Sequence, residues 1–176
     1  MSIVICAVHL NKTMYLASDC RAIKNGITND DFKKIFEIRP YCYYAITGTA
    51  EPGLWFLDRV KKREKARSTK ELIRWADKDF EKHGFPTLTV TIAGKDEKNN
   101  FFIWQKNNAG QQNYPEIDNN GVTFSISSNC KIPLFVNHFS ELVKNLPIDV
   151  AMSETIKYAS TIDDSISSKY EMYCLE

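Results

Sequence analysis

The chain has 176 residues, of which 43% are hydrophobic and 26% are charged, and its formal net charge is +1. This length fits one domain built around a large core. A charge so close to zero gives no electrostatic basis for binding nucleic acid or an anionic membrane surface. No apolar run reaches the roughly 20 residues of a membrane-spanning helix, and the apolar start lacks the basic segment of a signal peptide.

The cysteines and histidines do not have metal-binding spacing, so we expect no metal and no cofactor. An odd number of scattered cysteines indicates reduced thiols and therefore a cytoplasmic protein. The basic stretch 59–67 is interpreted as the solvated face of a helix. The five cysteines are Cys6, Cys20, Cys42, Cys130 and Cys174.

Apolar runs separated by polar turns predict two hairpins in the first quarter of the chain. Two helices are expected next, the first with Leu54, Leu57 (or Phe56) and Val60 on one side and the second capped by Ser68. Three strands, two more helices and a last strand complete the order. The expected strands are 3–8, 14–18, 36–38, 41–46, 87–93, 100–105, 121–125 and 169–175, and the expected helices are 51–67, 68–83, 132–146 and 149–162.

This order of strands, helix pair, strands, helix pair and strand predicts an α+β fold with sheets inside and helices outside. At its start, removal of Met1 would leave Ser2 with a hydroxyl and a free α-amine, a nucleophile and a base on one residue. An α-amine titrates at roughly 7.7–8.0, so much of it accepts protons at neutral pH. The simpler interpretation is that Ser2 is only the small residue after an initiator methionine.

Four segments, in this order, resemble patterns of the proteasome β subunits and HslV peptidases, which are N-terminal nucleophile (Ntn) hydrolases. Ala17-Ser18-Asp19-Cys20-Arg21-Ala22 resembles A-[AGS]-D-x-R-[AV], and Lys33–Ile38 resembles K-K-[IV]-x-x-[IL]. Ile46–Glu51 is similar to A-G-x-x-A-[DE], and Asp163–Ser168 is similar to R-D-x-x-S-G. The resemblance implies one domain over residues 1–176, folded as a four-layer αββα sandwich of two stacked, mainly antiparallel sheets flanked by two helix pairs.

The resemblance also implies how a peptide carbonyl would be attacked. Ser2 supplies the hydroxyl, and its own amine accepts the proton. Lys34 lowers the pKa of that hydroxyl by its positive charge, and Asp19 holds the Lys34 ammonium in place. Taken singly, Asp19 is also a strand-end residue and Lys34 one of a solvated pair.

Other residues complete the implied site. Gly48 offers its backbone N–H to the oxyanion, and Asp164 and Ser167 form a polar shell around the Ser2 amine. The substrate lies extended beside Gly48 and Ala22, as an added strand. Apolar residues at the positions of the specificity pocket favour an apolar residue before the cut, although they also suit a plain core. These residues are Ala22, Phe32, Ile46 and Ala50.

The sequence departs from the family pattern in two places. The usual nucleophile of the family is threonine, whereas the candidate here is Ser2. Matching Ser2-Ile3-Val4 to a Thr-Thr-Ile-Val start puts Met1 at the nucleophile position, and strand alternation favours this register. A bulge in the first hairpin would put Ser2 at the nucleophile position instead. A Gly-Ser-Gly segment of the family is replaced by 127–130, where Ser128 or Asn129 could take the role of the serine.

The resulting prediction is a cytoplasmic peptidase that forms a homo-oligomeric ring and cleaves peptides or unfolded proteins, with an ATPase unfoldase as partner. Two alternatives stay open. The chain could be an inactive proteasome-fold subunit that serves assembly or binding, or a small-molecule amidase on the same fold. A Lys34–Asp19 pair beside an open cleft would argue against the inactive subunit, because burying such a pair is costly.

Overall fold

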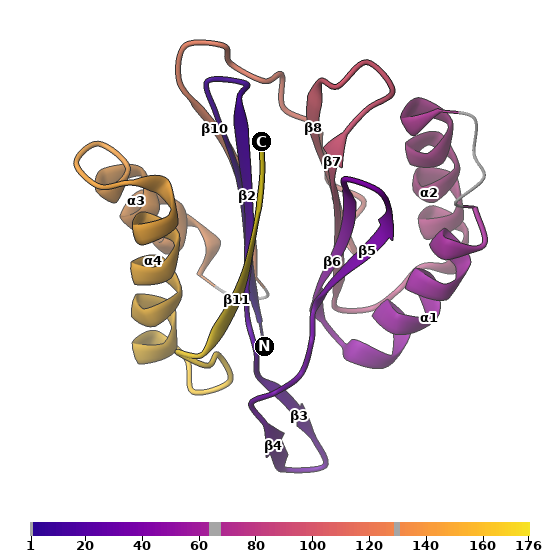
Figure 1. The fold of residues 1–176 in the computed structure, drawn as a ribbon. Coiled ribbons are helices and arrows are strands. Elements are labelled where there is room, and N and C mark those ends of the chain that lie inside the picture. The colour runs from indigo at the N-terminus through magenta and orange to yellow at the C-terminus, as the bar shows by residue number, and fades with distance from the viewer. Residues whose placement is uncertain (1, 64–67, 129–130) are drawn as a thin grey trace.

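The protein was analysed as a computed structural model that describes residues 2–63, 68–128 and 131–176. Two sheets lie face to face, and a helix pair covers the outer face of each, which confirms the predicted four-layer α+β sandwich (Figure 1). Helices α3 (Ile132–Leu142) and α4 (Ile148–Ile162) cover one sheet. Helices α1 (Ala50–Lys61) and α2 (Thr69–His83) cover the other.

The sheet beneath α3 and α4 has the strand order β10-β1-β2-β11, and all its neighbours are antiparallel. The chain start therefore lies on an interior strand, where Val4 is paired with Ser18 on one side and with Ser127 on the other. The strands of this sheet are β1 (Ile3–His9), β2 (Thr13–Asp19), β10 (Val122–Ser128) and β11 (Tyr170–Leu175).

The second sheet has the order β5-β6-β7-β8-β9 and is also antiparallel. Its strand β6 ends at Gly48, two residues before α1 begins. The strands of this sheet are β5 (Ile35–Arg39), β6 (Cys42–Gly48), β7 (Leu88–Lys95), β8 (Phe101–Asn107) and β9 (Gln112–Asn113).

A small hairpin of β3 (Ala22–Lys24) and β4 (Ile27–Asn29) projects beyond the sandwich, at the foot of Figure 1. This hairpin is not among the strands predicted from the sequence. The signal was the Asn25-Gly26 dipeptide, in which both residues have positive φ, as a two-residue hairpin turn requires.

Three apolar layers fill the sandwich. Phe56 and Trp104 are fully buried between the second sheet and its helices. Phe135, which belongs to α3, is fully buried between the first sheet and its helices. The layer between the sheets contains Val4 and Ile103. Cys6, Cys20, Cys42 and Cys174 are free thiols, whereas Cys130 lies outside the described residues.

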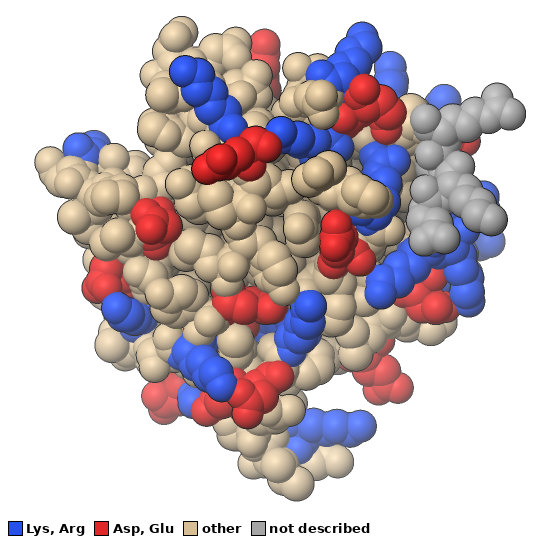
Figure 2. All heavy atoms as spheres, viewed as in Figure 1, with Lys and Arg blue, Asp and Glu red and all other residues tan. Residues whose placement is uncertain are grey.

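The surface in Figure 2 carries acidic and basic side chains intermixed. Among the described residues, no helix is both long and apolar enough to cross a membrane.

Two helices are shorter than predicted. Helix α1 ends at Lys61 because the residues after Val60 supply almost no apolar side chain to bury, and part of the expected extension, 64–67, lies outside the described residues. The expected Phe56, Leu57 and Val60 all lie on the buried face of α1, whereas Leu54 is 38% exposed. Helix α3 ends at Leu142 instead of 146, followed by a turn that leads into Pro147, whose ring disfavours helical backbone in the preceding residue.

Gly94 lies where β7 passes very close to the neighbouring hairpin turn. A Cβ atom added at Gly94 would be 2.0 Å from the carbonyl oxygen of Tyr41, which is backbone and cannot move independently. We expect Gly94→Ala to lower the free energy of unfolding by about 2–4 kcal/mol. Urea unfolding measures this loss. Gly110→Ala is the control, since a Cβ there meets nothing within 4 Å; an equal loss in both variants would contradict the prediction.

Candidate active site

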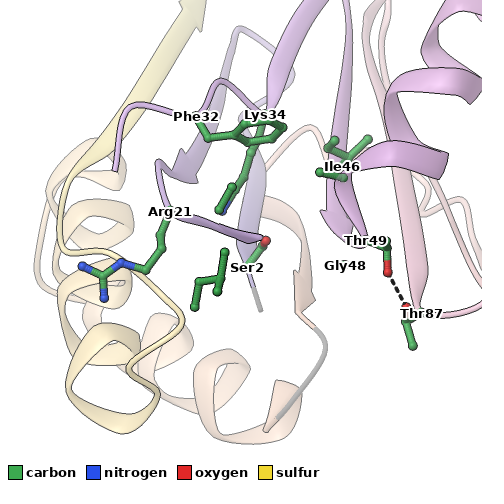
Figure 3. Close-up of a pocket in the computed structure, with 11 residues that line it drawn as sticks. Ser2, Arg21, Phe32, Lys34, Ile46, Gly48, Thr49 and Thr87 are labelled. Atoms are coloured by element: carbon green, nitrogen blue, oxygen red, sulfur yellow. Dashed lines mark hydrogen bonds between the residues drawn. The ribbon is translucent and has the colours of Figure 1, made fainter. Parts of the chain in front are cut away.

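A pocket of about 320 Å³ opens where β1 begins, beside the end of β6 and the start of α1. It is lined by three of the six residues predicted to be catalytic, Ser2, Lys34 and Gly48. Figure 3 shows Ser2 in the middle, with Arg21 on one side and Gly48 and Thr49 on the other. The four predicted substrate-binding residues also line it. They are Ala22, Phe32, Ile46 and Ala50.

Asp19, at the end of β2, is fully buried and holds several segments together around this pocket. Its Oδ1 accepts hydrogen bonds from Lys34 Nζ (2.7 Å) and from the backbone N–H of Ile3 (2.8 Å). Its Oδ2 accepts from the backbone N–H groups of Arg21 (3.0 Å) and Ser167 (3.3 Å). Asp19 thus forms the expected ion pair with Lys34 and also fixes the residue next to Ser2.

Lys34 is 2% exposed, immediately before β5. Burial lowers its pKa below the usual lysine range, and the neighbouring Asp19 carboxylate opposes part of this effect. The backbone N–H groups of Lys34 and Ile35 both donate to Glu171 Oε1 at 3.0 Å. The Lys34 ammonium is therefore held in a fixed position at the pocket wall.

Gly48 has φ +99°, a backbone conformation that suits glycine. Thr49 is the N-cap of α1, and Gly48, Thr49 and Ala50 all line the pocket. Because a helix N-terminus carries partial positive charge and unsatisfied N–H groups, this wall favours a developing negative charge.

The two remaining predicted residues lie in the turn before β11. Ser167 is 3% exposed and reaches the site through its N–H bond to Asp19. Asp164 is exposed, and its described contact is through its backbone carbonyl, which accepts from Arg21 Nη1 at 2.6 Å. Arg21 also binds Asp30 through two hydrogen bonds, of 2.6 and 2.9 Å, which lowers the pKa of that carboxyl.

Four lining residues were not predicted to belong to the site: Arg21, Ile23, Thr49 and Thr87. Thr49 and Thr87 share a hydrogen bond between their hydroxyls (2.7 Å), and Thr87 has φ +52°, which is rare for a β-branched residue. No local sequence signal marks Thr87, because the pairing of Gly48 with Leu88 brings it to the pocket from a distant segment.

Ser2 is 4% exposed and lines the pocket, while the N–H of the next residue, Ile3, is bound to Asp19. Ser128, the last residue of β10, is paired with Ile3. Met1, which could take the nucleophile position in the other register, and Asn129, considered for the role of the serine, lie outside the described residues.

No protein-family model and no curated protein sequence matches this chain. Among solved structures it is similar to the crystal structure of eukaryotic HslV from Trypanosoma brucei, with a TM-score of 0.76, 11% sequence identity and 99% coverage of each chain. The chain therefore has an HslV-like, proteasome-type fold.

Proposed function

We propose that this protein is an N-terminal nucleophile peptidase, with Ser2 as the nucleophile once Met1 has been removed. One observation carries the proposal. Ser2 lines a pocket together with Lys34 and Gly48, and the Lys34 ammonium is held 2.7 Å from the buried Asp19 carboxylate. This arrangement brings together a hydroxyl, a fixed positive charge and a helix N-terminus.

In the proposed reaction the Ser2 hydroxyl attacks the peptide carbonyl and its proton passes to the Ser2 α-amine. Lys34 favours the ionised oxygen, and the Gly48 N–H with the start of α1 stabilises the oxyanion. The C–N bond breaks, the leaving amine takes the proton, and an ester on Ser2 remains. Water then hydrolyses the ester and restores the hydroxyl. Asp164 and Ser167 act as the polar shell of the amine.

The Lys34–Asp19 pair argues against the alternative of an inactive subunit. The three backbone N–H groups that bind Asp19 explain why a carboxylate is needed there. They do not explain a buried ammonium at the wall of an open pocket, because backbone N–H groups alone can hold a buried carboxylate in its ionised form. A catalytic role of Lys34, acting on a reacting group, would account for the buried ion pair.

We base two further proposals on the fold, one on the substrate and one on the assembly. An extended peptide would add as a strand beside Gly48 and Ala22. We further propose a homo-oligomeric ring in the cytoplasm, supplied with unfolded protein by an ATPase. A small-molecule amidase is the remaining alternative, and it would not degrade an unstructured protein such as casein.

The first experiment is the intact mass and N-terminal sequence of the untagged protein, followed by assays on casein and short peptides. A chain that begins at Ser2 and hydrolyses both supports the peptidase. Hydrolysis of small amides alone supports the amidase. A chain that keeps Met1 and hydrolyses neither would overturn the proposal in favour of an inactive subunit.

The pocket also predicts substrate preference. Its charged lining residues are already paired, Lys34 with Asp19 and Arg21 with Asp30, so its apolar walls determine what it accepts. We expect peptides with leucine or phenylalanine before the cut to have kcat/KM values at least about tenfold above those with aspartate or lysine, because the described residues that line the pocket offer no free partner for a buried charge. Matched fluorogenic peptides measure the ratio, and equal values would refute the preference.

A further inference from the structure

A second cavity, of about 430 Å³, lies between β10, the strands β8 and β9, and α3. All of its lining residues are uncharged. Polar side chains from both sheets contribute to it, while α3 adds Ile132 and Val136. The polar lining residues that lie on strands include Thr89, Gln105, Asn113, Ser125 and Ser127.

These polar residues occupy positions where the sandwich otherwise buries apolar side chains. Ser127 and Ser125 are directly opposite Val4 and Cys6, which belong to the apolar layer between the sheets. Residues opposite one another in an antiparallel pair have their side chains on the same face. Ser125 and Ser127 therefore face the second sheet, in a layer that is apolar farther along β1.

The hydroxyl of Ser127 is the most informative group in this cavity. Ser127 is 2% exposed, and its Oγ has no hydrogen-bond partner among the described residues. Because a buried unpaired hydroxyl is costly, such groups point to a bound polar molecule.

The cavity lies on the opposite side of β1 from the candidate active-site pocket. The order β10-β1-β2 puts this cavity on the β10 side, whereas Arg21 and Ala22, which follow β2, line the other pocket. Ser2 stands between them at the start of β1. Since Ser127 is paired with Val4, its diagonal distance to the position of Ser2 is roughly 7–8 Å, within the reach of a short peptide.

We propose that this cavity is the subsite for the leaving-group side of the substrate, and that it binds an uncharged, amide-bearing peptide segment such as one containing asparagine or glutamine. The inference rests on the proposed peptidase function. With the acyl part of the peptide in the apolar pocket and its carbonyl at Ser2, the chain beyond the cut extends toward Ser127. The amide groups of such a segment match the hydroxyl and carboxamide lining, and its lack of charge matches a wall without ions.

The test measures binding without requiring hydrolysis. The Ser2→Ala protein is titrated with three product-like peptide amides, Asn-Gln-Gly, Asp-Glu-Gly and Lys-Lys-Gly, which all carry the same free amine. We expect the neutral peptide to bind at least about tenfold more tightly than the other two, because none of the described residues that line the cavity carries a charge. Adding Ser127→Ala should weaken its binding about three- to tenfold, the value of one hydrogen bond.

Ser160→Ala is the matched control, since it removes the same hydroxyl from α4, where Ser160 donates to Lys157. It should not alter binding. Ser127→Ala should not lower the melting temperature, because the hydroxyl it removes has no hydrogen-bond partner in the described part of the chain. Equal binding of the three peptides, or no effect of Ser127→Ala, would overturn the subsite even if the wild-type protein is an active peptidase. Selective binding by a protein that never hydrolyses peptides would instead reject the peptidase and retain the site.

Discussion

Ser2→Ala is expected to abolish peptide hydrolysis, with kcat falling by at least about 10³-fold. The variant keeps the α-amine and the Lys34–Asp19 pair but lacks the oxygen that would form the ester. Its stability should change by less than about 1 kcal/mol, because serine and alanine differ by one hydroxyl. Initial rates on a fluorogenic peptide, compared with urea unfolding of the same samples, separate loss of chemistry from loss of folding.

Ser2→Thr provides the matching test for retained chemistry. It keeps the hydroxyl and the amine in the same places and adds a methyl group that restricts the rotamer. We expect measurable hydrolysis from Ser2→Thr and none from Ser2→Ala, provided that mass spectrometry shows Met1 removed from both. Full activity in Ser2→Ala would show that another group attacks the substrate.

The layers of this fold could be predicted from local sequence. Leu88, Val90 and Ile92 occupy every second position of β7 and all face the core beneath α1 and α2, whereas Ala93 belongs to the apolar layer between the sheets. Ser68 was identified from its capping pattern, and its Oγ accepts from the Glu71 N–H at 3.1 Å. The end of α1 was harder to place, because the charged residues after Val60 have high helix propensity but no face to bury.

The site could be predicted only in part. Lys34 and Gly48 belong to segments with recognisable patterns, and the structure places both at one pocket with Ser2. Thr87 and the Ile3 and Ser167 N–H donors to Asp19 depend on strand pairing and on a turn more than a hundred residues away, which no local pattern encodes. The same holds for Ser127, whose significance depends on facing a second sheet.

The Asp19–Lys34 pair should respond unequally to loss of either partner. Asp19→Ala removes the acceptor of Lys34 and of the Ile3, Arg21 and Ser167 N–H groups, so we expect it to cost about 3–5 kcal/mol of stability. Lys34→Met should cost less, about 1–3 kcal/mol, because Asp19 keeps its three backbone donors. Both should lower kcat at least about 100-fold. Urea unfolding and initial rates measure the two effects, and a larger stability loss in Lys34→Met would contradict this account.

The pH dependence of the stability of the wild-type and Lys34→Met proteins tests whether burying the charged form of Lys34 lowers the free energy of unfolding. Burial lowers the pKa of Lys34 in the folded protein below its ordinary value of 10.5. Between the folded and unfolded pKa values the unfolded chain binds more protons, so the free energy of unfolding contributed by Lys34 rises with pH. Below both values the penalty is constant. We therefore expect the wild-type protein to gain stability relative to Lys34→Met as the pH rises toward 10.5. If the difference in unfolding free energy between the two proteins falls instead, the ion pair with Asp19 outweighs the effect of burial, and Lys34 stays fully protonated in the pocket.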